Sequence, residues 1–328
     1  MKLGSDLKKL LSITTSFVTA LSFCILPACA GNTAAPSQLQ ALQSTTPDFD
    51  KEIEVLLSLP EEKIDIGSAA LTLEKEIYPE LNVDVYSALL DHAVGRARTM
   101  TNGSTSPDQR IRVLNTLLYK IIGINYAFSD PNGDRNLRVR HLKGVLDTKR
   151  GNCVSMTRLY LAIAQRLGYP VYAVHVPDHI FVRYVDPNLE EQNIEASSNG
   201  GYISDEKYIK DLQISERGIK SGAYLKTLSN KEYLALLIAE NAIYWGKHGD
   251  INRAIKYLEY SVKLYPHSPE INDNLGIAYL DYSKKFKGEE AKRYAAKSQF
   301  YQKQAIELGL AALPRKDYIK QMNFDVIR

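Results

Sequence analysis

The sequence predicts an α+β protein in which a helix packs on a small antiparallel sheet, with helical regions on both sides. Apolar side chains recur at helical spacing over residues 50–128 and again over residues 231–313. Between these regions, residues 171–176 and 180–185 are runs of β-branched and aromatic side chains, which is typical of strands. Residues 145–168, which contain Cys153, form an apolar helical stretch directly before the first run. This order of elements predicts a mixed core between two all-α regions.

The first 28 residues have the features of a signal peptide. Three lysines lie within the first nine residues, and a mostly apolar run over residues 10–26 follows. Residues 26–29 (Leu-Pro-Ala-Cys) resemble the bacterial lipobox, which implies that Cys29 is acylated and becomes the N-terminus. The alternatives are an ordinary signal peptide cut nearby or an uncleaved anchor. Ala30 carries no inner-membrane retention signal by the same resemblance, so we expect a periplasm-facing protein anchored to the outer membrane by lipid.

The remaining chain divides into four parts. Residues 29–49 are rich in Ala, Ser, Thr, Gln and Pro and predict a flexible tether. We expect the mixed domain over residues 50–225, a helical repeat region over 231–313 and a C-terminal tail over 314–328. Without residues 1–28 the chain carries 38 basic and 37 acidic side chains. This balance gives no electrostatic reason to expect a nucleic-acid partner.

The local patterns place the elements of the mixed domain in order. Apolar spacing predicts helices within residues 53–77, 86–97 and 111–121, with a break at residues 102–104 (Asn-Gly-Ser). The helix that contains Cys153 is expected to stop at Gly168. After the two strands, residues 193–197 are a candidate third strand, residues 199–201 (Asn-Gly-Gly) a turn, and residues 204–212 a small helix.

Residues 231–313 contain a degenerate repeat. One unit with tetratricopeptide spacing is formed by Trp245, Ala254, Leu258, Ser261 and Pro266, and a second by Leu275, Gly276, Tyr279 and Ala305. Ala305 follows Ser261 by 44 residues, whereas a standard unit has about 34, so we expect about ten extra residues near 284–292. The alternative is a plain pair of helical hairpins. Two units are too few for a free-standing solenoid, so they should pack on the preceding domain.

Cys153 is expected to be the one cysteine of the mature protein without a lipid, because Cys24 and Cys29 lie in or next to the export segment. An exported chain with a single thiol cannot close an internal disulfide. Cys153 follows Gly151 and Asn152 at the start of a helical stretch, and a helix N-terminus stabilises a thiolate. The sequence therefore favours a nucleophile over the alternative, a cysteine buried by core packing.

A cysteine nucleophile needs a base, and His179 is the best placed of the six histidines. His179 begins the strand that follows the turn at residues 177–178. The start of a strand behind a core helix can face that helix's N-terminus. His175, four residues earlier, is the second choice, and His92, His141, His248 and His267 are expected to have surface or packing roles.

Glu195 is the candidate acid that orients the imidazole. A tight turn at residues 186–188 would place Glu195 opposite His179. A five-residue loop centred on Leu189 would place it opposite Arg183, where it would form only a cross-strand ion pair. A bulge or a diagonal contact could still bring Glu195 to His179. Both registers stay open on the sequence alone.

The backbone N–H of Cys153 is a candidate donor to an oxyanion, and Asn152 is either a second donor or the cap of the helix. The sequence contains neither a zinc-binding spacing of cysteines and histidines nor a glycine-rich phosphate loop. We therefore expect neither a metal nor a cofactor.

The chain resembles the SirB-type transglutaminase-like family, known as transglutaminase core 2, over roughly half its length. The matching stretches are residues 59–65 (LPEEKID), 76–79 (EIYP), 144–151 (GVLDTKRG), 166–168 (RLG) and 177–183 (PDHIFVR). The resemblance implies a papain-like α+β core with Cys153 as nucleophile, His179 as base and Glu195 as acid. Glu195 replaces the commoner Asp of the family. Many members carry Ile-Pro at the cysteine position, so Cys153 argues for retained chemistry here.

Two functions compete on the sequence. The first is a thiol enzyme that cleaves or transfers the acyl group of an amide in a peptide or protein substrate, through a thioester on Cys153. Hydrolysis is slightly favoured over transfer because no amine site is evident. The second is a non-catalytic, lipid-anchored scaffold that binds a protein partner on its tetratricopeptide-like helices.

Overall fold

The computed structural model describes residues 49–133, 135–187, 189 and 193–310. The expected export segment, the lipidation site Cys29, the tether up to residue 48 and the C-terminal tail lie outside these residues. From Asp50 onward, the described residues group into one unit. None of the helices in this part of the chain combines the length and the hydropathy that a membrane span requires.

Four α-helices form the N-terminal part: α3 (Phe49–Ser58), α4 (Ile66–Glu74), α5 (Val83–Thr101) and α6 (Pro107–Asn115). Short polar side chains begin them. Asp65 Oδ1 accepts the Ser68 N–H at 2.5 Å at the start of α4, and Asn82 caps α5 in the same way. The predicted break at 102–104 lies between α5 and α6, where Asn102 adopts a left-handed conformation with φ of 49°. A π-helical segment, Thr116–Ile122, follows α6.

The prediction of a single helix over residues 145–168 was wrong, because two helices with a short strand between them occupy this region. Helix α7 (Leu142–Thr148) ends at Lys149, which has a φ of 60°. Strand β2 (Arg150–Gly151) then pairs in parallel with β1 (Asn125–Tyr126), and α8 (Cys153–Arg166) begins after it. The sequence pattern missed this small sheet because two-residue strands carry no periodicity.

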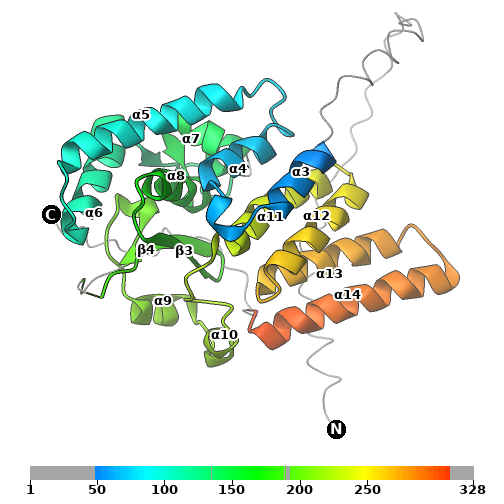
Figure 1. The fold of residues 1–328 in the computed structure, drawn as a ribbon. Helices are drawn as coiled ribbons and strands as arrows, with labels where there is room; N and C mark the ends of the chain where they lie inside the picture. Colours follow the sequence, from blue (N-terminus) through cyan, green and yellow to red (C-terminus); the bar gives the residue numbers. More distant parts are fainter. Residues whose placement is uncertain (1–48, 134, 188, 190–192, 311–328) are drawn as a thin grey trace, which may run out of the picture. The chain divides into compact units, whose positions relative to one another are not determined.

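Helix α8 lies at the centre of the mixed domain. It stops where Gly168 takes a φ of 72°, as predicted. It contacts strands β3 (Val171–Val176) and β4 (His179–Tyr184) as well as helices α4, α5 and α7 (Figure 1). The antiparallel sheet has the order β3-β4-β5, where β5 is only Asn193–Ile194. The α+β class predicted from the sequence is confirmed.

Two short helices and four longer ones follow the sheet. They are α9 (Asp205–Leu212), α10 (Glu216–Lys220), α11 (Asn230–Lys247), α12 (Ile251–Leu264), α13 (Pro269–Ser283) and α14 (Gly288–Leu308). Each of the last four contacts the next one (Figure 1). Helix α14 has 21 residues and is longer than α12, which has 14.

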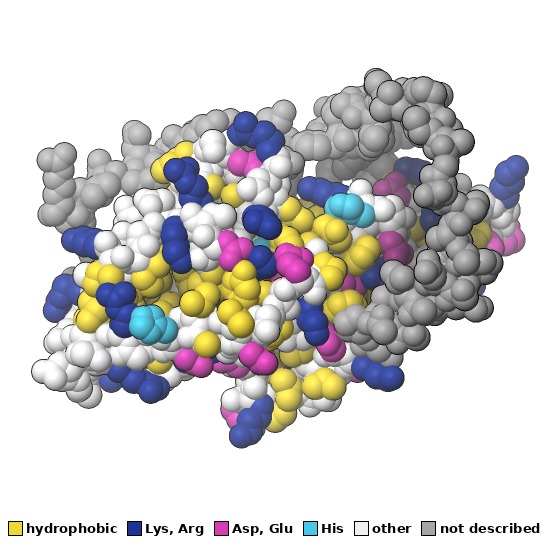
Figure 2. Space-filling model, turned by 90° about the horizontal axis from the view of Figure 1, so that it is seen from above, with side chains coloured by type: hydrophobic (Ala, Val, Ile, Leu, Met, Phe, Trp, Pro, Cys, Tyr) yellow, Lys and Arg dark blue, Asp and Glu magenta, His cyan; other side chains and the backbone are white. Residues whose placement is uncertain are grey.

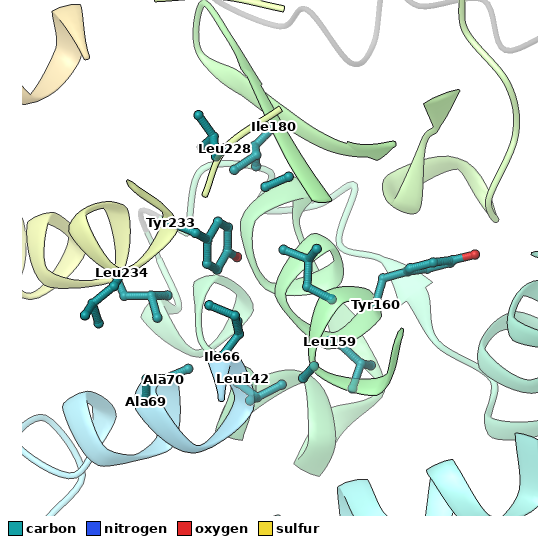
Figure 3. Packing of buried hydrophobic residues seen from close by; sticks show 14 of the residues in the cluster. Ile66, Ala69, Ala70, Leu142, Leu159, Tyr160, Ile180, Leu228, Tyr233 and Leu234 are labelled. Atoms are coloured by element: carbon teal, nitrogen blue, oxygen red, sulfur yellow. The ribbon is translucent and has the colours of Figure 1, made fainter. Parts of the chain in front are cut away.

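The buried core joins the N-terminal helices, α8, the sheet and α11. Figure 3 shows apolar side chains of α4, α7, α8 and β4 converging with those that precede and begin α11. A buried carboxylate completes this contact. Glu74 of α4 accepts the backbone N–H groups of Leu142 and Lys143 at 2.6 and 2.8 Å, and its side chain also pairs with Arg158 of α8 at 2.7 Å. Glu74 therefore caps α7 and ties α4 to α8.

A second buried carboxylate links the N-terminal helices to the C-terminal ones. Glu76 accepts hydrogen bonds from Tyr257 Oη at 2.7 Å, Arg253 Nη1 at 3.0 Å and Asn241 Nδ2 at 3.2 Å. Asn241 belongs to α11, and the other two donors belong to α12. Helices α11 and α12 are therefore anchored on the mixed domain.

Aromatic rings join the last two helices to each other. Tyr279 of α13 stacks between Tyr294 and Tyr301 of α14, with ring centroids 6.1 and 5.9 Å apart. Tyr282 meets Tyr294 edge-on at 4.8 Å. Such pairs add to the stabilisation from burial alone.

On the face shown in Figure 2, Lys and Arg side chains are interspersed with Asp and Glu side chains around hydrophobic ones. Helix α5 carries two exposed aliphatic side chains, Val85 and Leu89. Leu89 also lines a cavity of about 140 Å³, together with Leu159 and Ile163 of α8. Neither Cys153 nor His179 lines this cavity, so it is separate from the candidate site described next.

Candidate active site

Cys153 is the first residue of α8, and a capping box formed by Asn152 and Ser155 fixes this helix N-terminus. Asn152 Oδ1 accepts the N–H groups of Val154 and Ser155 at 3.0 and 3.3 Å, and Ser155 Oγ accepts the Asn152 N–H at 3.2 Å. Asn152 Nδ2 donates to Pro131 O at 3.1 Å. The Asn152 amide is thus occupied as a cap. The free thiol of Cys153 is 8% exposed.

His179 begins β4 and lies beside this helix end. Thr157, one turn after Cys153 and on the same helix face, donates its Oγ1–H to Ile180 O at 3.1 Å. This bond fixes the start of β4 against the first turn of α8. The His179 side chain is 3% exposed and interacts electrostatically with the Cys153 side chain.

Glu195 reaches His179 by a diagonal contact, and neither register considered from the sequence is present. Val182 pairs with Ile194 and Arg183 with Asn193. Continued by one residue, this register sets Glu195 across from Phe181, on the same sheet face as His179. The His179 Nε2–H donates to Glu195 Oε2 at 2.6 Å. Because Nε2 is engaged, Nδ1 is the ring nitrogen left for the thiol.

The Glu195 carboxylate is fully buried and held from several sides. Glu195 Oε1 accepts the N–H and Oγ–H of Ser197 at 3.0 and 2.6 Å, and Oε2 also accepts the Tyr208 Oη–H at 2.7 Å. Arg183 instead pairs with Asp205 at 2.6 Å, so Glu195 is not its cross-strand partner. Ser197 and Tyr208 were not singled out from the sequence, which places Tyr208 only on a predicted small helix.

Electrostatic attraction determines the pKa shifts of His179 and Glu195. Burial by itself would lower the pKa of His179, but the Glu195 carboxylate and the interaction with Cys153 outweigh it and raise that pKa to about 10. Burial likewise acts to raise the pKa of Glu195, and the His179 charge with the hydrogen bonds of Ser197 and Tyr208 lowers it overall. The two side chains are therefore an imidazolium and a carboxylate at neutral pH.

The other histidines lie away from the thiol or are engaged elsewhere. His175 of β3 has its Nδ1 3.6 Å from Glu270 Oε2 of α13 and packs near Tyr224, so it faces the C-terminal helices. His141 is buried and shares a 2.7 Å hydrogen bond with Tyr78 Oη. Within the described ranges, no group of three or more His, Cys, Asp or Glu side chains could hold a metal ion.

Comparison with known proteins gives a family match for part of the chain. Residues 84–238 match the family model of the transglutaminase-like superfamily, and this range includes Cys153, His179 and Glu195. Two curated relatives, both named UPF0162 protein, come from Xylella fastidiosa strains Temecula1 and 9a5c. They are 22% and 23% identical over 232 residues, which are 69% of this chain and 80% of each relative.

A solved structure gives a weaker likeness. The crystal structure of menin that reveals its binding site for the Mixed Lineage Leukemia protein has a TM-score of 0.43 and 14% identity. It covers 78% of this chain and 69% of menin, and the likeness is too low to support an argument. By the family match, residues 84–238, just under half of the chain, are similar to the transglutaminase-like superfamily.

Proposed function

We propose that this protein is a thiol enzyme that cleaves or transfers the acyl group of an amide through a thioester on Cys153. The observation that carries the proposal is the buried His179–Glu195 pair at the helix end that bears the thiol. A cationic imidazole and a helix N-terminus both favour the thiolate, which is the nucleophilic form. The transglutaminase-like domain supports the same class of reaction.

In this proposal each group has a step. The Cys153 sulfur attacks the amide carbonyl carbon, and a C–S bond forms. His179 gives its proton to the leaving amine as the C–N bond breaks, while Glu195 keeps the ring oriented. Water or a second amine then attacks the thioester, with His179 accepting its proton. Water gives hydrolysis, which we favour, and an amine gives transfer.

The same proposal extends to the place of action. We propose that the chain is a SirB-type transglutaminase-like protein. It is exported and anchored by an acylated Cys29, with its globular part in the periplasm. The basic, apolar and small-residue segments of the first 29 residues support this. Metabolic labelling with an alkyne fatty acid should label wild type and fail to label Cys29→Ala, and unlabelled wild type would contradict lipid anchoring.

The first experiment measures thiol reactivity in the full chain. An iodoacetamide-alkyne probe should label wild type on Cys153 and fail to label Cys153→Ala. Labelling should slow by about 100-fold in His179→Ala, because the thiolate loses its imidazolium partner. His175→Ala is the matched control, since it removes a buried histidine from the neighbouring strand that faces α13, and its rate should equal that of wild type.

The second experiment tests acyl chemistry. Wild type is incubated with a peptide pool, with and without a dansylated alkylamine, and products are identified by mass spectrometry. Cleaved or deamidated peptides indicate hydrolysis, and dansylated peptides indicate transfer. Cys153→Ala should give neither. If wild type yields no product and no acyl adduct on Cys153, the enzymatic proposal fails, and the scaffold function on α11–α14 takes its place.

A further inference from the structure

Tyr126 carries a buried hydroxyl that makes no hydrogen bond within the described part of the chain. Its side chain is 6% exposed, and no hydrogen-bond partner for Oη is found among the residues that the structure describes. A buried hydroxyl without a partner costs free energy, and such groups in native proteins call for an explanation. One explanation is a partner that is present only during the reaction.

Tyr126 lies between the two segments that supply the candidate site. It pairs with Gly151, two residues before Cys153. The N–H groups of Asn125 and Ala127 donate to Lys149 O and Gly151 O, both at 2.8 Å, and so fix Tyr126 on both sides. Strand β1 also contacts the turn at Ala196–Ser198, which directly follows Glu195.

The hydroxyl stays protonated in this position. Burial raises the pKa of Tyr126, and the negative charges of Cys153 and Glu195 raise it further. Tyr126 lies opposite Gly151, two residues before Cys153, and its hydroxyl makes no hydrogen bond among the described residues. A donor for an oxyanion needs this placement, because the oxyanion sits on the carbon that bonds to sulfur, one atom away from it.

We propose that the Tyr126 hydroxyl is a catalytic donor that, with the backbone N–H of Cys153, binds the oxyanion formed when Cys153 attacks the carbonyl. This inference rests on the proposed function. As the C–S bond forms, the carbonyl π pair moves to oxygen, and Tyr126 donates a hydrogen bond to it without losing its proton. The pair returns to carbon when the C–N bond breaks and the amine leaves with the proton of His179.

The test compares two reagents that attack the same sulfur. Acetylation of Cys153 by p-nitrophenyl acetate passes through an oxyanion and releases p-nitrophenolate. Alkylation by iodoacetamide displaces iodide and forms no oxyanion. In Tyr126→Phe, acetylation should slow by about 100-fold, the loss typical for one oxyanion donor. Alkylation should keep its wild-type rate. Mass spectrometry of the Cys153 peptide confirms the site of both reactions.

Tyr119→Phe is the matched control. The Tyr119 hydroxyl is also buried without a hydrogen-bond partner among the described residues. Burial, Tyr160 and Glu195 raise its pKa, whereas Cys153 is not among the causes. Removing it should leave both rates unchanged. The thermal midpoint of Tyr126→Phe should not fall, since an unpaired hydroxyl is lost, and this measurement shows that the variant folds.

The possible outcomes distinguish a failure of the Tyr126 role from a failure of the proposed thiol-enzyme function. Equal acetylation of wild type and Tyr126→Phe would overturn the role of Tyr126 and leave the enzyme intact. An equal loss of acetylation and alkylation would also overturn it, because Tyr126 would then position the thiol. If wild type is alkylated but never acetylated, the proposed function fails and the inference fails with it.

Discussion

His179 and Glu195 show how a buried pair keeps its charge. Both side chains are almost fully removed from water, and burial alone favours their neutral forms. The 2.6 Å hydrogen bond between them reverses this, and the donors Ser197 and Tyr208 complete the shell of the carboxylate. The charge of the imidazole thus depends on an acid that the solvent does not reach.

Glu195→Gln tests that dependence. A neutral amide cannot hold an imidazolium, so the pKa of His179 should fall and iodoacetamide should alkylate Cys153 at pH 7 about tenfold more slowly. Ser197→Ala is the control, because it removes a 2.6 Å hydrogen bond to Glu195 but keeps the carboxylate. Its rate should stay close to that of wild type. Equal rates in Glu195→Gln and wild type would show that the carboxylate charge does not act on the thiol.

The stability that the pair provides should depend on pH. Because the pKa of His179 is raised, its contribution is complete below the ordinary value of 6.5 and is lost as pH rises toward about 10. Because the pKa of Glu195 is lowered, its contribution is complete above the ordinary value of 4.5 and is lost as pH falls below it. The pair should therefore stabilise most between these two ordinary values.

Urea unfolding of wild type and of the double variant His179→Gln, Glu195→Gln measures this effect. The difference in their free energy of unfolding should be largest near pH 5 to 6 and shrink toward both about pH 3 and about pH 10. A difference that stays constant over this range would mean that the pair is not charged in the folded state.

At the scale of elements, helix α7 depends on the absence of a side chain at Gly144. A Cβ built there would overlap the carbonyl group of Arg138. Gly144→Ala should therefore destabilise the protein by about 3 kcal/mol or more and disturb the segment that leads to Cys153. Gly95→Ala is the matched substitution in the exposed middle of α5, where a Cβ meets nothing within 4 Å. It should stabilise the protein by about 0.5–1 kcal/mol. Urea denaturation measures both, and equal effects would refute the steric argument.

The sequence predicts elements well where a pattern is long and poorly where it is short. The run 171–176 is long enough to identify a strand, and Gly168 marks a helix end that the structure confirms. The pairing of β1 with β2 spans two residues on each strand, so Tyr126 had no signal in the sequence. Its position follows from the long-range pairing alone.

The approach of Glu195 to His179 illustrates the same limit. The order of Cys153, His179 and Glu195 along the chain was readable, but the contact depended on a register that shifts with each residue of the intervening loop. The observed register lies between the two considered. The sequence therefore allowed the contact between Glu195 and His179 only as a diagonal cross-strand contact, which the long side chain of Glu can reach.

At the scale of the whole molecule, Glu76 joins the mixed domain to the C-terminal helices. Glu76→Ala removes the acceptor for Tyr257, Arg253 and Asn241. The loss should be about 3 kcal/mol, because buried donors then lack a partner. Helix α11 shares the core of α4 and α8, so the midpoints of tyrosine fluorescence and of helical circular dichroism should fall together in urea.

Glu216→Ala serves as the control for Glu76→Ala. It removes an exposed ion pair with Lys220 and should not change the midpoint measurably. Separate transitions for the two signals in Glu76→Ala would contradict the shared core.

The aromatic stack between α13 and α14 has a consequence for how the chain opens. Its rings come from these two helices alone, so separating either helix from the other breaks several ring contacts at once. Helices α13 and α14 should therefore detach from the rest of the protein together, as one cooperative unit, rather than unfold residue by residue from their ends. Amide hydrogen exchange would then give the interiors of both helices the same protection, and replacing Tyr279 by Leu would lower it in both together.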